Sequence, residues 1–174
     1  MRKRIGDMII FAMLGSIMFI SKLIMEFLPN VHALALFIAV FTLIYRIKAL
    51  IPIYVFVFLT GLINGFNLWW IPYLYIWAIL WGLLILIPKN ASLRVKFILS
   101  TVFCALHGIL YGTLYAPFQA IAFGLNFQGM LAWIAVGFPW DVVHMCGNIA
   151  LSFLIIPLYK IIVKMESKRE LYKK

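Results

Sequence analysis

Charged side chains are scarce in this chain. Only 11% of its 174 residues are Asp, Glu, Lys or Arg, while 66% are hydrophobic. A soluble domain averages about a quarter charged and about half apolar residues, and a soluble chain this apolar would aggregate through its exposed patches. The composition therefore predicts an integral membrane protein, in which residues 1–174 form a single membrane domain.

Motifs for metal binding, phosphate binding and covalent catalysis are missing as well. Cys104 and Cys146 lie in apolar segments without a CxxC spacing, so we expect both to behave as small apolar side chains. The chain contains no Walker sequence, HExxH pair, DxxxD run or nucleophile motif. We therefore expect that it is not an enzyme, does not hydrolyse ATP and uses neither a metal nor another cofactor.

Long apolar runs recur along the chain, and about 20 such residues are needed to cross the hydrocarbon core of a bilayer. We expect an all-α membrane protein with six transmembrane helices, at residues 7–28, 32–45, 49–63, 72–87, 97–116 and 140–163. The fifth helix is expected to break at Pro117. Residues 118–139 would then form a long connection at the membrane surface or dipping into it.

The basic residues behind the net charge of +10 gather, with one exception, at the chain ends and in two loops. Of the 15 Lys and Arg residues, 14 lie within residues 2–4, 46–48, 89–96 and 160–174, and the exception is Lys22. Basic residues gather on the cytoplasmic side of membrane spans. We therefore expect both termini in the cytoplasm of a multi-pass protein of the cell membrane, and a lipid bilayer rather than nucleic acid as the reason for the charge.

The most unusual stretch is GFPWDVVHMCGN, at residues 137–148. Asp141, His144, Asn148 and Ser152 follow a spacing of 0, 3, 7 and 11, which places them within a stripe roughly 80° wide on one helix face. Ionisable residues inside membrane spans are costly and usually functional. The alternative is that these polar groups satisfy one another where helices pack.

Aromatic residues repeat this spacing in the fourth expected helix, at Trp70, Tyr73, Trp77 and Trp81. Trp and Tyr are common at both membrane interfaces, so an aromatic belt is the alternative to a binding wall. Trp77 and Trp81 lie progressively deeper than such a belt, at about 1.5 Å per residue.

Two further groups of polar residues lie at helical spacing in other expected helices. His107, Tyr111 and Tyr115 run beside the small residues Gly108, Gly112 and Ala116, which allow close helix packing. Lys22 and Glu26 are four residues apart, a spacing that permits an ion pair. A buried structural histidine and mutual charge neutralisation are the respective alternatives.

The expected depth of these side chains in the membrane favours a binding pocket over a proton relay. Nearly all these side chains are expected in the outer half of the membrane, whereas a relay would extend across its full thickness. Aromatic walls with a few polar groups are typical of small-molecule sites. We expect Asp141 to accept hydrogen bonds or pair with a cation, Asn148 to use both sides of its amide, and the tryptophans to stack on a flat ring.

These features resemble the substrate-binding S component of energy-coupling factor (ECF) vitamin transporters. The resemblance rests on six expected spans, cytoplasmic termini, the long connection at residues 118–139, and the run G-hydrophobic-P-[FW]-D-hydrophobic-hydrophobic-H-x-x-x-N, met here from Gly137 to Asn148. It implies a bacterial protein that binds a water-soluble micronutrient from outside. Uptake would require a transmembrane T component and two cytoplasmic ATPases.

The resemblance also implies a docking face for the T component on the first helix. Members of the family use an AxxxA pattern of small residues there. This chain has Ala12 and Ser16 at that spacing, with Gly15 beside them, so the second alanine of the pattern is replaced by another small residue.

Two other functions stay open at this point. One is an intramembrane enzyme that uses His107, His144 and Asp141, and the other is a self-sufficient small-molecule carrier. Carriers often show internal repeats or helices broken at mid-membrane, and neither is evident here. A vitamin, a vitamin precursor and a nucleobase-like compound all fit the expected pocket.

Overall fold

The computed structural model describes residues 2–171 and the side chains of residues 5–169, and all regular elements within this range are helical. The helices are α1 (Arg2–Ile24), α2 (Leu34–Tyr45), α3 (Leu50–Asn64), α4 (Tyr73–Leu84), α5 (Leu93–Ile109), α6 (Tyr111–Phe123), α7 (Phe127–Ser152) and α8 (Ile155–Leu171). Two short 3-10 helices, η1 (Arg46–Ala49) and η2 (Leu68–Trp70), precede α3 and α4. The prediction of an all-α protein is confirmed. The basic residues Lys173 and Lys174, and the side chains of residues 2–4, lie outside the described part.

Four segments within the described residues are long and apolar enough to cross a membrane: Ile5–Ile24, Leu34–Asn64, Leu93–Phe123 and Phe127–Ser152. The segment Leu68–Leu84 is apolar but shorter. These helices are compatible with a multi-pass membrane protein. Six crossings remain a prediction, because α2 and α4 have 12 residues each. A helix of that length spans about 18 Å, which is less than the roughly 30 Å of hydrocarbon.

Helix α2 forms the centre of the fold. Its sequence LALFIAVFTLIY is apolar on every side, and nine of its residues are buried. It packs against α1, α4, α5, α7 and α8. A helix that is hydrophobic all round is found in a protein core or within a membrane, and here the other helices are arranged around α2.

Arg46 joins the end of α2 to the end of α4. Its backbone has a φ of 56°, in the left-handed region, and this ends α2. Its guanidinium donates to the carbonyl of Ile87 at 2.9 Å and to that of Ile85. In return, the indole of Trp81 donates to the Arg46 carbonyl at 3.1 Å. Trp81, expected as part of an aromatic binding wall, therefore holds two helix ends together.

The prediction for residues 97–163 was wrong at three boundaries. The helix breaks at Leu110, between α5 and α6, while Pro117 lies inside α6. Most of residues 118–139 belongs to α6 and to the first half of α7, so these residues are not an irregular connection. The last expected helix is in turn divided between α7 and α8 around Phe153. Proline within a membrane helix is tolerated when neighbouring groups satisfy the freed carbonyl, which is why Pro117 was a poor marker.

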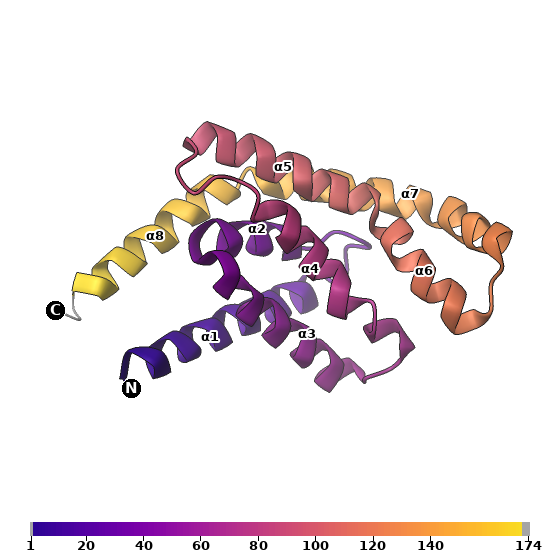
Figure 1. Cartoon of the computed structure of the whole chain (residues 1–174), viewed down its shortest axis with the longest axis horizontal. Coiled ribbons are helices and arrows are strands. Elements are labelled where there is room, and N and C mark those ends of the chain that lie inside the picture. Colours follow the sequence, from indigo (N-terminus) through magenta and orange to yellow (C-terminus); the bar gives the residue numbers. More distant parts are fainter. Residues whose placement is uncertain (1, 172–174) are drawn as a thin grey trace.

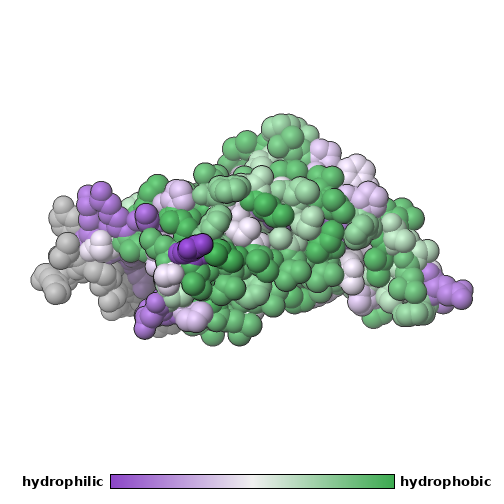
Figure 2. Space-filling view, turned by 90° about the horizontal axis from the view of Figure 1, so that it is seen from above, coloured by the Kyte–Doolittle hydropathy of each residue, from purple (hydrophilic) through white to green (hydrophobic). Residues whose placement is uncertain are grey.

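The described chain ends lie at the same end of the molecule, together with the start of α5 (Figure 1). Hydrophilic residues gather at that end, while apolar residues dominate the middle of the face shown in Figure 2. At the opposite end, α6 and the first half of α7 form a projecting hairpin (Figure 1). Both described chain ends therefore lie away from this hairpin.

A polar network ties α1 and α2 to α8 at the terminal end. Arg169 pairs with Asp7 of α1 and with Glu166, at 3.1 Å, on its own helix. The Tyr45 hydroxyl, at the end of α2, donates to Glu166 at 3.0 Å. The first two helices are therefore joined to the last one by one group of charged and polar side chains.

Candidate functional site

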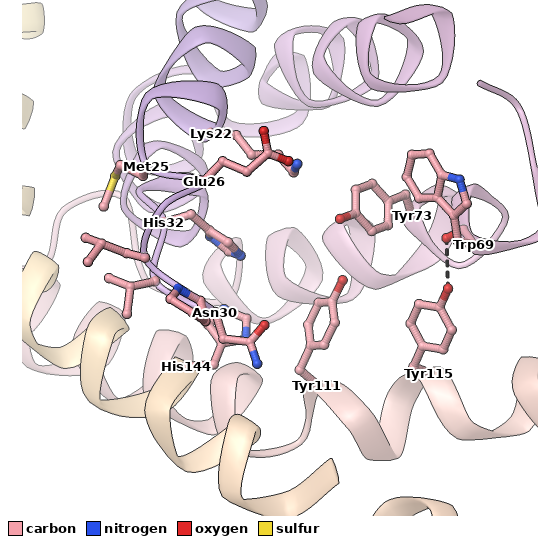
Figure 3. Close-up of a pocket in the computed structure, with 13 residues that line it drawn as sticks. Lys22, Met25, Glu26, Asn30, His32, Trp69, Tyr73, Tyr111, Tyr115 and His144 are labelled. Carbon is pink, nitrogen blue, oxygen red and sulfur yellow. Dashed lines mark hydrogen bonds between the residues drawn. The ribbon is translucent and has the colours of Figure 1, made fainter. Parts of the chain in front are cut away.

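A cavity of about 360 Å³ opens between the end of α1, the α1–α2 loop, the start of α4, α6 and α7 (Figure 3). These elements meet in the half of the molecule away from the termini (Figure 1). The cavity is lined by Lys22, Met25, Glu26, Leu28, Pro29, Asn30, Val31, His32, Trp69, Tyr73, Tyr111, Tyr115 and His144. Its volume falls within the range of about 300–1,000 Å³ that is usual for small-molecule sites.

Six of the predicted site residues line this cavity: Lys22, Glu26, Tyr73, Tyr111, Tyr115 and His144. The side chains of Tyr73 and Tyr111 point their hydroxyl groups toward the same space, while Lys22 of α1 and Glu26 of the turn after it extend across it from the α1 side (Figure 3). The Tyr115 hydroxyl donates to the carbonyl of Trp69 at 2.9 Å, which joins α6 to the turn before α4. The cavity therefore has an aromatic wall and carries both charges on the α1 side.

Asp141 does not line this cavity. Both of its carboxylate oxygens accept from the backbone N–H of Gly112, at 3.0 and 3.1 Å. Gly112 is the second residue of α6, so its N–H is one of those that a helix start leaves without a partner inside the helix. A Cβ at this position would lie 2.6 Å from the carboxylate. Asp141 thus caps α6 from a neighbouring helix and occupies the space that a side chain at residue 112 would need.

The carboxylate of Asp141 borders a second cavity of about 360 Å³, on the other side of Tyr111 and Tyr115. This cavity is lined by Asn30, Tyr111, Gly112, Tyr115, Gln119, Trp133, Gly137, Trp140 and Asp141. It therefore shares Asn30 and the two tyrosines with the first cavity, and these three side chains form the wall between them.

Asn148 also lies outside the main cavity and joins two helices. Its amide donates to the carbonyl of Cys104 on α5 at 2.9 Å, and the Ser152 hydroxyl donates to the Asn148 carbonyl at 2.6 Å. A Cβ at Gly108 would lie 2.8 Å from the backbone of Met145 on α7. The close packing predicted from the small residues of α5 is confirmed, and it involves α7.

The two tryptophans predicted to bind substrate are placed differently from each other. Trp70 donates from its indole to the carbonyl of Val57 at 2.8 Å, and this contact holds the turn before α4. Trp77 is fully buried behind the cavity. Its ring centroid lies 5.5 Å from that of His107 and 5.8 Å from that of Tyr111. His107 is buried as well, and its Nε2 pairs with the Ile76 carbonyl at 3.1 Å.

Sequence reasoning missed several lining residues, above all His32, Asn30 and Trp69. All three lie in or beside turns, where no helical periodicity marks them. The ring of His32 lies 4.8 Å from that of His144. Burial, and to a smaller extent the neighbouring His144, lowers the pKa of His32 to about 3. His32 is therefore an uncharged imidazole at neutral pH.

The predicted docking residues of α1 do not share one face. Gly15 is buried against α3, where a Cβ would lie 2.6 Å from Val55 and 2.8 Å from the Pro52 carbonyl. Ala12 is exposed, and Ser16, which is partly exposed, donates to the Ala12 carbonyl at 3.0 Å. Ala12 and Ser16 are therefore available to a partner, whereas Gly15 serves packing inside the chain.

The described residues include no group of three or more His, Cys, Asp and Glu side chains placed to hold a metal ion. Comparisons with protein family models, with curated proteins and with solved structures found no match.

Proposed function

We propose that this chain is the substrate-binding S component of an ECF-type transporter, which binds a small water-soluble micronutrient in the cavity beside His144. The observation that carries the proposal is the cavity itself, in the half of the molecule away from the described chain ends. It joins a tyrosine and tryptophan wall to imidazoles and to one charge of each sign. Such a lining suits a vitamin, a vitamin precursor or a nucleobase-like compound better than a lipid or an ion.

The lining residues and the helix-joining residues have different roles in this proposal. Tyr73, Tyr111 and His144 contact the substrate, and Lys22 and Glu26 pair with its charged groups. Asp141 and Asn148 are positioning residues, because their polar groups are bonded to the backbone of α6 and α5. They keep the start of α6, and therefore Tyr111 and Tyr115, in place against the cavity.

The remaining parts of the proposal concern the membrane and the partners. Six spans with cytoplasmic termini place the cavity toward the outside of a bacterial cell membrane, where it captures substrate. The exposed Ala12 and Ser16 on α1 dock on a transmembrane T component, and two cytoplasmic ATPases supply the energy. The described chain ends at one end of the molecule, together with the basic residues that the sequence has near both of its ends, support this orientation.

The experiment that tests binding is native mass spectrometry of the purified protein in lipid nanodiscs. We expect one small solute to co-purify, and calorimetric titration then gives its affinity. Tyr111→Phe removes one hydroxyl from the cavity and should weaken binding about two- to tenfold, as expected for a hydrogen bond of about 0.5–1.5 kcal/mol. Tyr54→Phe is the matched control, because its hydroxyl bonds to the Leu74 carbonyl away from the cavity.

Three outcomes would contradict the proposal. Equal loss of affinity in both tyrosine variants would show that the cavity is not the binding site. Uptake of the solute into liposomes by this chain alone would favour a self-sufficient carrier. Chemical conversion of the solute by the purified chain would favour an intramembrane enzyme.

A further inference from the structure

Four aromatic rings form a closed cluster at one wall of the main cavity: those of His32, Trp77, His107 and His144. Around the cluster, neighbouring ring centroids are 5.8 Å apart for His32 and Trp77, 5.5 Å for Trp77 and His107, 6.3 Å for His107 and His144, and 4.8 Å for His144 and His32. We call this group the ring cluster. His32 and His144 line the cavity, and Trp77 and His107 lie behind them.

Each ring of the cluster carries one buried nitrogen without a hydrogen-bond partner in the described protein. These atoms are His32 Nδ1, Trp77 Nε1, His107 Nδ1 and His144 Nε2. The side chains of Trp77, His107 and His144 are at most 3% exposed. Buried polar atoms nearly always have a partner, so four unpaired nitrogens in one cluster point to a group that the protein binds there.

Chemistry fixes the hydrogen-bonding role of two of these nitrogens. An indole N–H only donates, so Trp77 needs an acceptor. The Nε2 of His107 faces the Ile76 carbonyl, which only accepts, and Nε2 must therefore carry the ring proton. Its Nδ1 is then an acceptor that needs a donor. A group that satisfies both nitrogens must offer an acceptor to Trp77 and a donor to His107.

The ring cluster also selects against a charged group. His32 is uncharged, since burial lowers its pKa to about 3. Carboxylate and ammonium groups are present only on the α1 side of the cavity, at Glu26 and Lys22 (Figure 3). Burying an isolated charge among neutral rings is costly, so any charged part of a bound molecule stays on the α1 side.

We propose that the ring cluster binds the N–H and C=O edge of an uncharged lactam-type heterocycle. The ring carbonyl accepts from Trp77, and the adjacent ring N–H donates to His107. The His32 ring, which belongs to the irregular α1–α2 loop, swings away from Trp77 to admit this edge, and His144 and Tyr111 pack on the heterocycle. This assignment rests on the proposed function, because it names the substrate class of the same cavity.

Three matched probes test the assignment in the full-length protein: quinazolin-4(3H)-one, its 3-methyl derivative and quinazoline. Only the first has both the N–H and the C=O. We expect calorimetry to show that it binds at least about tenfold more tightly than either of the others, which is the effect of losing one good hydrogen bond. Equal affinities for the three compounds, or no binding of quinazolin-4(3H)-one, would overturn the assignment.

Two tryptophan variants locate the contact. Trp77→Phe removes the unpaired N–H and should reduce the preference for quinazolin-4(3H)-one over quinazoline to the part that comes from the ring N–H donating to His107, with quinazoline affinity unchanged. Trp70→Phe removes an indole N–H that is bonded to Val57, so it should keep the preference. An undiminished preference in Trp77→Phe would also overturn the assignment.

The outcomes separate this inference from the proposed function. If a solute co-purifies and binds while the three probes show no preference, the proposed function stands and the lactam assignment fails. If neither a co-purifying solute nor any probe binds, both fail.

Discussion

Replacing Asp141 tests whether this carboxylate holds the fold or holds the substrate. Its two oxygens share the backbone N–H of Gly112. A hydrogen bond to a charged group contributes about 1.5–3 kcal/mol, and a neutral one about 0.5–1.5 kcal/mol. Asp141→Asn keeps one acceptor oxygen and should therefore lower the free energy of unfolding by about 1 kcal/mol. Asp141→Leu removes the whole interaction and should cost about 1.5–3 kcal/mol.

These energies correspond to measurable shifts of the thermal midpoint. For a chain of this size, 1 kcal/mol shifts the midpoint by about 2–4 °C. We therefore expect a decrease of about 2–4 °C for Asp141→Asn and about 3–12 °C for Asp141→Leu. The assay is thermal unfolding of the purified protein in one detergent, followed by intrinsic fluorescence. Calorimetric titration of the co-purifying solute is run on the same samples.

A second variant reaches the same interaction from the other side. Gly112→Ala places a Cβ where the carboxylate now lies, at 2.6 Å, so it should destabilise the protein as Asp141→Leu does. Affinity for the solute should change far less than stability in all three variants. An affinity loss of tenfold or more in Asp141→Asn, with an unchanged midpoint, would refute the positioning role and make Asp141 a substrate contact.

Three further predictions concern α1, the topology and pH. Ala12→Trp should abolish uptake in cells while solute affinity stays near wild type. Gly15→Trp should instead destabilise the purified protein, because residue 15 packs on α3. Equal effects of the two changes on stability would contradict this prediction. In a variant without Cys104 and Cys146, a cysteine introduced at Asn67 should react with a membrane-impermeant reagent added to whole cells, and a cysteine introduced at Asn90 should not. Labelling at Asn90 would contradict cytoplasmic termini. The pKa of His32 is lowered to about 3, so the unfolded chain takes up a proton that the folded one does not. Stability should therefore fall as the pH drops below about 6.5, by up to about 2 kcal/mol at pH 5, and His32→Gln should remove this part of the pH dependence.

Helix boundaries were predictable where the sequence marks them chemically. The ends of α2 and α3 fall within a residue or two of expectation, because a basic turn follows one and Asn64 and Gly65 end the other. The break at Leu110 has no such mark, since it lies between two apolar stretches that both favour helix. Pro117, the strongest local mark in that region, is tolerated inside α6.

The candidate site was predictable as a set of helix faces but not as a list of contacts. Periodicity correctly indicated that Asp141, His144 and Asn148 face inward, and all three are buried. It could not show that two of them bond to backbone groups on other helices, because backbone donors and acceptors leave no trace in side-chain spacing. Residues of turns, such as His32 and Trp69, reach the cavity only through tertiary folding.

The contact between Asp7 and Arg169 has a consequence for how the chain is assembled. The two residues are 162 positions apart, so during synthesis the first helix is made long before its partner on α8 exists. The network can close only after every intervening helix has been synthesised. A chain cut after Val163 would lose both Glu166 and Arg169, and with them the polar contacts that join α1 and the end of α2 to the last helix. The last turns of α8 thus complete a structure whose first residues were made earliest.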